Sequence, residues 1–151
     1  MEIEELRAAL GTAFQEYQRG VDAIDEAVAD RLGINRTDLR IIDELSGGPQ
    51  AAGELATRIG ISPAAMTTAL DRLERKGHAR RIRDPEDRRK VLVELTDQTQ
   101  AVCEEAMGPI AAEGEKLLAP YSEDELARFL EFMQAAIAAG RRHVERLRAQ
   151  P

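Results

Sequence analysis

Apolar residues recur every three or four positions along the N-terminal part of the chain. This spacing puts them on one face and predicts one long helix that ends near Leu32-Gly33. An apolar seam sustained over about 30 residues is typical of a helix that meets a partner helix. The seam consists of Ile3, Leu6, Leu10, Phe14, Tyr17, Val21, Ile24 and Val28.

Three shorter helices are predicted to follow. Asn35 is expected to cap the first, which stops at the breaker cluster 46–49. The second covers roughly 51–59 and ends in a tight glycine turn. The third begins at Ser62-Pro63, a cap followed by proline at the first helical position, and ends at Gly77 as a left-handed cap. Their predicted core residues are Leu39, Ile41, Ile42, Leu45, Leu55, Ala56, Ile59, Met66, Ala69, Leu70 and Leu73.

After these helices the spacing of apolar residues changes from the helical period to the alternation typical of strands, and it then returns to the helical period. Residues 81–83 and 90–95 alternate apolar and charged side chains around the polar turn 84–89, which predicts a hairpin. Thr96-Asp97 is expected to cap another helix, kinked at Gly108-Pro109. A capping box of Ser122 and Glu125 opens the last helix. Its apolar stripe consists of Leu126, Phe129, Leu130, Met133, Ile137, Val144 and Leu147.

Helix, tight turn, helix and charged hairpin, in that order, make a winged helix-turn-helix. We therefore predict a mainly α fold with a two-stranded β-wing and long N- and C-terminal helices. The major groove of B-DNA, about 12 Å wide, admits one helix, and a hairpin tip can reach the neighbouring minor groove. Residues 35–96 are predicted to form the DNA-binding lobe, and 1–34 with 97–151 a helical dimerisation region.

The face of the third short helix that points away from the core carries short side chains. Thr67 and Thr68 can each offer a hydroxyl and a methyl group to base edges, whereas Arg72 and Arg75 are better placed for phosphates. Any two-helix unit has an exposed polar face, so this face alone is weak evidence for DNA binding. The basic hairpin directly downstream provides much of the support for that prediction. The predicted DNA-contacting residues of this helix are Ser62, Pro63, Ala64, Thr67, Thr68, Arg72 and Arg75.

The charge distribution supports a single DNA-binding face. The chain has 151 residues and a net charge of −7, which is unexpected for a DNA-binding protein. Between Arg58 and Lys90, however, ten basic residues stand against five acidic ones, a net of +5, which leaves −12 for the rest. A basic centre between acidic arms would turn one face towards phosphate and the remainder away.

The middle of the chain resembles the multiple-antibiotic-resistance regulator (MarR) family. The resemblance implies a homodimer built from the terminal helices that binds a pseudo-palindromic operator. It also implies that Arg89 enters the minor groove or stiffens the wing through Asp87, and Arg83 and Arg88 complete the predicted DNA-binding set of the wing. The matching motifs are Glu54-Leu55-Ala56, Gly60-Ile61-Ser62, Leu70-Asp71-Arg72-Leu73-Glu74-Arg75-Lys76-Gly77, Asp84-Pro85-Glu86-Asp87-Arg88-Arg89 and Leu92-Val93-Glu94-Leu95-Thr96.

The resemblance further implies an effector bound between the dimer base and the DNA-binding lobe. The candidate effector-binding residues are Phe14, Tyr17, Leu32, Ile41 and Cys103, although aromatic residues on an apolar seam are more often core. For Cys103, an ordinary small core residue is favoured over a redox sensor. For His78, a half-buried structural histidine is favoured over a ligand.

Several classes of protein are disfavoured by composition. We find no phosphate-cradling loop, metalloprotease motif or nucleophile with a credible base, so neither an enzymatic activity nor a cofactor is expected. A single cysteine and two histidines disfavour a metal site and fit a reducing cytoplasm. No apolar run approaches a membrane span.

The chain is thus expected to be a sequence-specific transcriptional regulator, acting as a repressor released by a small lipophilic or aromatic ligand. Activation instead of repression stays open. The main alternative is an architectural DNA-binding protein with little sequence preference. A winged-helix module that has lost DNA binding is disfavoured by the intact basic segment from Arg81 to Lys90.

Overall fold

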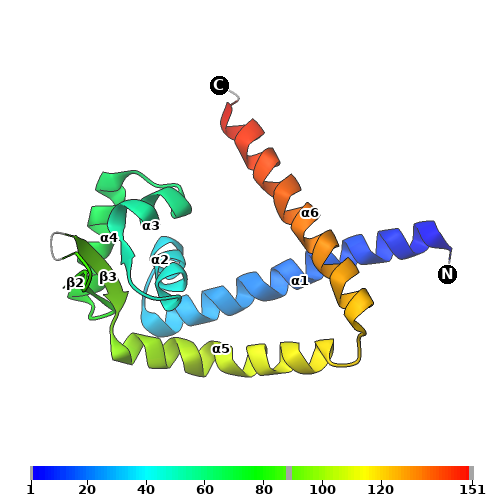
Figure 1. Cartoon of the computed structure of the whole chain (residues 1–151), viewed down its shortest axis with the longest axis horizontal. Coiled ribbons are helices and arrows are strands. Elements are labelled where there is room, and N and C mark those ends of the chain that lie inside the picture. The colour runs from blue at the N-terminus through cyan, green and yellow to red at the C-terminus, as the bar shows by residue number, and fades with distance from the viewer. Residues whose placement is uncertain (1, 88–89, 150–151) are drawn as a thin grey trace. The chain divides into compact units, whose positions relative to one another are not determined.

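The computed structural model describes residues 2–87 and 90–149 and confirms the mainly α fold (Figure 1). Contacts along the chain divide it into two compact units, Met1–Met107 and Gly108–Pro151. The elements are α1 (Ile3–Leu32), α2 (Arg36–Ser46), β1 (Gln50–Ala51), α3 (Ala52–Ile59), α4 (Pro63–Arg75), β2 (Ala79–Arg83), β3 (Val91–Leu95), α5 (Asp97–Leu118) and α6 (Glu123–Ala149).

The helices of the first unit begin and end at the residues that the sequence predicts. Gly33 closes α1 with a left-handed backbone, at φ 64°. The Asn35 side chain accepts the N–H of Asp38 at 2.9 Å, and that of Ser62 accepts the N–H of Ala65 at 3.2 Å. These bonds satisfy amide groups that have no partner inside the helix, which fixes where α2 and α4 start.

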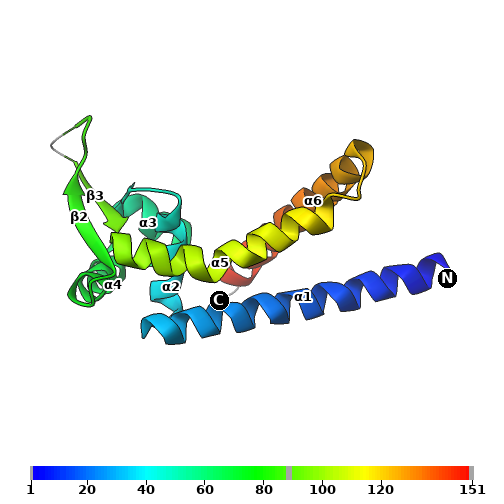
Figure 2. The same ribbon diagram turned by 90° about the horizontal axis from the view of Figure 1, so that it is seen from below.

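The small sheet contains one strand that the sequence analysis did not predict. Strand order is β1-β3-β2, with both pairs antiparallel. Val93 in the central strand faces Arg81 on one side and Gln50 on the other. Because β1 has two residues, it is too short to show an alternating pattern. Figure 2 shows β2 and β3 side by side, extending away from α2 and α4 as a wing.

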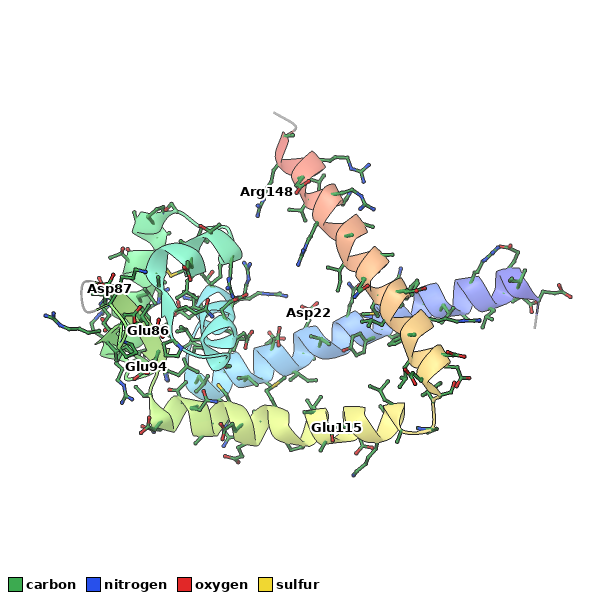
Figure 3. The ribbon with its side chains drawn as sticks, in the orientation of Figure 1. Asp22, Glu86, Asp87, Glu94, Glu115 and Arg148 are labelled. Carbon is green, nitrogen blue, oxygen red and sulfur yellow. The ribbon has the colours of Figure 1, made fainter. Side chains whose placement is uncertain are left out.

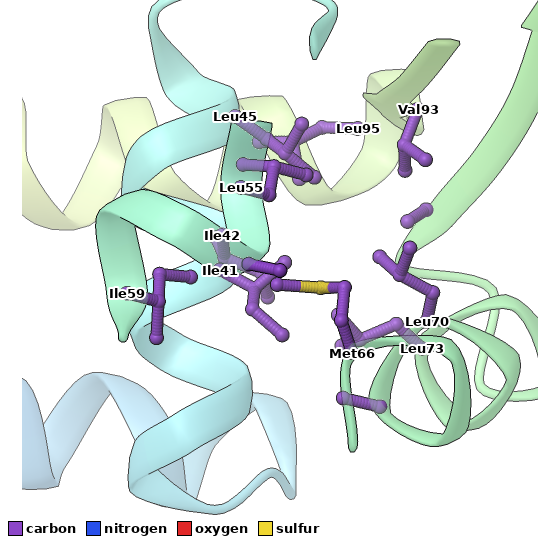
Figure 4. Packing of buried hydrophobic residues seen from close by; sticks show 13 residues of the cluster. Ile41, Ile42, Leu45, Leu55, Ile59, Met66, Leu70, Leu73, Val93 and Leu95 are labelled. Carbon is purple, nitrogen blue, oxygen red and sulfur yellow. The ribbon is translucent and has the colours of Figure 1, made fainter. Parts of the chain in front are cut away.

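The core of the first unit lies between α2, α3, α4 and the sheet (Figure 4). All of the core residues predicted for the three short helices are buried, and Ile41, Leu55 and Leu73 are completely so. Val93 from β3 closes the cluster on the side of the sheet. Burial of this apolar surface holds α4 against α2 and α3 and leaves the opposite face of α4 in solvent.

The two long apolar stripes are exposed within the single chain. Val28 and Ala29 are the buried residues of α1, at its C-terminal end, whereas Ile3 is 61% exposed. No described residue of α6 is buried, and its Phe129 is 53% exposed. In the described part of the chain, no helix has the length and apolar character needed to cross a membrane.

Candidate nucleic-acid interface

The outer face of α4 is built from small side chains, as predicted. Pro63, Ala64, Thr67 and Thr68 are all exposed. The Thr67 hydroxyl donates to the carbonyl of Pro63 at 3.0 Å, and the Thr68 hydroxyl donates to that of Ala64 at 3.1 Å. Both threonine side chains are therefore held by hydrogen bonds to their own helix, and each hydroxyl proton is donated to a backbone carbonyl of α4. Their contact with DNA stays a prediction.

The guanidinium of Arg72 is bound to a buried carboxylate on α2. Its Nε lies 2.7 Å from Oδ2 of Asp38 and its Nη2 lies 2.5 Å from Oδ1. The Asp38 side chain is completely buried. The hydrogen bond to this carboxylate raises the pKa of Arg72. An acid in the first turn of a helix is ordinary, so the sequence gives no signal that Asp38 pairs with Arg72.

A second ion-pair cluster joins α4 to the wing. Arg81, in β2, donates through Nη2 to Oδ1 of Asp71 at 2.8 Å and through Nη1 to Glu74. Its backbone N–H also donates to Oε1 of Glu74 at 3.0 Å. Because one arginine contacts two successive turns of the helix, the base of the wing is tied to the outer side of α4. The sequence motifs do not reveal this link, because Arg81 is separated from Asp71 and Glu74 by a turn and a change from helix to strand.

The C-terminal end of α4 is tied to the C-terminal end of α1. Lys76 donates through Nζ to the carbonyl oxygen of Gly33. Nε2 of His78 lies 3.0 Å from the carbonyl oxygen of Leu32, and Nδ1 lies 3.1 Å from Oγ1 of the buried Thr99. A carbonyl can only accept, so Nε2 carries a proton. His78 is half-buried, as predicted, and both of its ring nitrogens have partners within the chain.

The turn of the wing is ordered by Asp84, whose Oδ1 accepts the N–H groups of Glu86 at 2.8 Å and Asp87 at 3.2 Å. Backbone bonds between Asp84 and Lys90, and between Lys90 and Asp87, close the hairpin. Figure 3 labels Glu86 and Asp87 at this turn. Arg83 is exposed at the end of β2. The predicted contacts Arg88 and Arg89 lie outside the described residues.

The five candidate effector residues do not form one site within the chain. Phe14 lies 18 residues before Leu32 on α1, about 27 Å along the helix axis. Ile41 is completely buried in the core, whereas Tyr17 is 67% exposed. Cys103 and Leu32 are partly buried and each packs against the core. An apolar hollow of about 630 Å³ lies elsewhere, where α5 meets α6, and is lined by Leu117, Leu118, Tyr121, Glu125, Leu126, Arg128 and Phe129.

The environment of Cys103 does not favour a reactive thiolate. Burial raises the pKa of this thiol, and the nearby carboxylates of Asp43 and Glu104 raise it further. Reactive cysteines need the opposite setting, one that is electropositive and open to solvent. The geometry therefore agrees with the interpretation of Cys103 as a packing residue.

Comparison with known proteins matches this chain to transcriptional regulators. Residues 32–90 match the model of the MarR family. The uncharacterised HTH-type transcriptional regulator YcgE of Bacillus subtilis is 33% identical over 124 residues, which cover 82% of this chain and 80% of YcgE. That similarity extends well beyond the segment that the family model matches.

Solved structures show the same fold. Wild-type MarR from E. coli, without ligand, is 24% identical, with a TM-score of 0.54 over 84% of this chain and 96% of MarR. A mutant of MepR from S. aureus is 15% identical, with a TM-score of 0.64 over 86% of this chain and 96% of MepR. Taken with the exposed face of α4 and the adjoining wing, these matches show that the chain belongs to the MarR family of winged helix-turn-helix, DNA-binding transcriptional regulators, which are not enzymes.

Proposed function

We propose that the chain represses transcription by occupying a pseudo-palindromic operator as a homodimer. In this proposal α4 enters the major groove and the wing reaches the adjacent minor groove. The observation that carries it is the outer face of α4, where Thr67 and Thr68 are exposed beside a wing that Arg81 holds to the same helix. Small side chains on a groove-facing helix allow close approach to base edges.

The dimer is supported by the two exposed apolar stripes. Monomeric proteins rarely leave apolar surface of this extent in water, so the stripes on α1 and α6 are expected to be covered by a second copy. A MepR mutant from S. aureus was solved bound to an oligodeoxyribonucleotide, and it shares this fold with a TM-score of 0.56 at 16% identity. In such a dimer the two copies of α4 and the wing would be related by a two-fold axis, which matches the symmetry of a palindromic site.

The experiment that tests this function is selection of duplexes from a random pool by the purified full chain. A regulator is expected to select a converged palindrome, with half-sites centred about one helical turn apart. The architectural alternative predicts no convergence and equal affinity for selected and scrambled duplexes. A reporter gene placed behind the selected duplex then distinguishes repression from activation.

Release by a small lipophilic or aromatic acid is part of the same proposal and rests on the family resemblance. Such a ligand would act by favouring a dimer whose two α4 helices are spaced wrongly for the operator. Because the five candidate residues are dispersed, the test uses the whole protein and a panel that includes salicylate. Weaker operator binding in the presence of one compound supports release. A panel that neither binds nor changes DNA affinity contradicts it.

A further inference from the structure

The Asp38–Arg72 pair is the one ion pair described in the structure with a completely buried carboxylate. Asp38 stands in the first turn of α2, and its side chain has no exposure, whereas that of Arg72 is 31% exposed. Removing a carboxylate from water is costly unless its oxygens are paired and hydrogen-bonded. Arg72 donates to both carboxylate oxygens, from Nε at 2.7 Å and from Nη2 at 2.5 Å. This two-bond arrangement is the one in which the planar guanidinium matches a carboxylate.

This pair acts on the orientation of α4. The contacts of α4 with the core cluster are apolar and include Met66, Leu70 and Leu73. The other polar contacts described above run to the wing and to α1, and not to α2. Apolar packing is non-directional, so it limits rotation of a helix less sharply than a two-bond ion pair does. Arg72 follows Thr68 by four residues, which makes the two neighbours on the helix surface. The Asp38–Arg72 pair therefore lies one helical turn from a residue that is predicted to face the groove.

We propose that Arg72 is a positioning residue of the DNA-reading helix, and that Asp38 determines specificity through it without reaching DNA. The sequence alone suggests that Arg72 contacts phosphate, but in the structure its guanidinium is held by Asp38. The proposal rests on the proposed function, in which α4 reads base edges. It predicts that removing an acidic side chain weakens operator binding. Simple electrostatic repulsion between Asp38 and DNA predicts the opposite.

The test compares Asp38→Asn, Arg72→Met and the double variant with the wild-type chain. Affinity is measured against salt concentration on the selected operator and on a scrambled duplex. Thermal unfolding identifies which variants are folded. We expect each single variant to lose about tenfold or more on the operator, as for misplaced base contacts, with little change on scrambled DNA. The double variant is expected to lose no more than the larger single loss, because both changes break one interaction.

Arg75→Met provides the matched control. Arg75 is exposed on the same helix, and its Nε donates to the carbonyl of Asp71 at 3.3 Å, which leaves its Nη groups for phosphate. As a phosphate contact it would weaken binding to both duplexes and reduce the salt slope by about one counterion per subunit. Arg72→Met is expected to leave that slope unchanged.

Two outcomes would overturn the proposal. One is an Arg72→Met variant that behaves like Arg75→Met on both duplexes. The other is a folded Asp38→Asn variant with operator affinity equal to or above that of wild type. If Arg72→Met does not fold, Asp38→Asn decides the question, since asparagine nearly preserves the shape of the side chain. Failure of the proposed function is distinguishable, because the wild-type chain would then select no operator at all.

Discussion

Thr68 tests whether α4 reads bases. Its hydroxyl proton is used by the carbonyl of Ala64, so the side chain presents oxygen lone pairs and a methyl group. Such a side chain suits the amino groups of adenine or cytosine and the methyl group of thymine. We expect Thr68→Ala to cost about 1–3 kcal/mol on the operator and much less on scrambled DNA, measured by equilibrium binding.

Thr12→Ala is the control for that substitution. Thr12 is also exposed and donates to the carbonyl four residues earlier, at 3.2 Å, but it lies on α1. Its removal is expected to leave DNA affinity unchanged. If both threonine variants lose the same amount of operator affinity, the loss comes from removing a hydroxyl that bonds to its own helix, and not from losing a base contact.

Substitution of Arg89 tests whether the wing contacts DNA. Its position in the family motif implies contact with the minor groove or the DNA backbone, so Arg89→Ala should weaken operator and scrambled duplex alike. The slope of log affinity against log salt is expected to fall by about one counterion per subunit. Arg148→Ala removes the same charge from the end of α6 and should change neither quantity. An unaltered slope for Arg89→Ala would mean that this residue does not touch DNA.

Cys103 should react slowly with alkylating reagents near neutral pH. Because burial and the carboxylates of Asp43 and Glu104 raise the pKa of its thiol, the thiolate fraction at a given pH is below that of an ordinary cysteine. The rate of modification by iodoacetamide should therefore begin to rise at higher pH than in the chain unfolded by guanidinium. A rate at pH 7 above that of the unfolded chain would contradict the assignment as a packing residue.

The glycine that follows α4 is required by its backbone conformation. Gly77 has φ 75°, and an added Cβ would meet no atom within 4 Å. Gly77→Ala should therefore destabilise the fold through the backbone alone, by about 1–2 kcal/mol. Gly53→Ala also finds open space, but it lies inside α3 and should stabilise by about 0.4–1 kcal/mol. Denaturant unfolding is expected to show a lower free energy of unfolding for Gly77→Ala and a higher one for Gly53→Ala. Changes of the same sign would refute this account.

The elements were predictable because their signals are local. Asn35, Ser62 and Gly77 act on amides or carbonyls a few residues away, so the sequence places the boundaries of α2 and α4. Contacts between distant residues were not predictable in the same way. Asp38 and Arg72 are 34 positions apart, and Asp38 also satisfies the ordinary preference for an acid in the first turn of a helix. Burial by neighbouring elements decides its role, and no local pattern encodes that burial.

The apolar stripe of α6 is expected to control dimer formation. Leu130 is 56% exposed, and Leu130→Glu would place a charge in an interface between two copies. We expect this variant to be monomeric in analytical ultracentrifugation at concentrations where the wild type is dimeric. Gln134→Glu adds the same charge at another exposed position of α6 and should leave the dimer intact.

Deleting 126–151 extends that test. The truncated chain is expected to be unstable or monomeric, and a stable, DNA-binding dimer without these residues would contradict the dimer proposed here. The division into a helical dimerisation region and a lobe at 35–96 stays a prediction until such variants are measured.

The link between α1 and α4 has a consequence for how this protein can evolve. Lys76 and His78 donate to the main-chain oxygens of Gly33 and Leu32, and almost any residue supplies such an oxygen. Substitutions along α1 therefore leave both acceptors in place, provided that the helix still ends at the same position. Outside its apolar stripe and the buried Val28 and Ala29, the surface of α1 is free to diverge towards a new partner or ligand while its attachment to α4 is retained. This link itself depends on the two donors and on the glycine that ends α1.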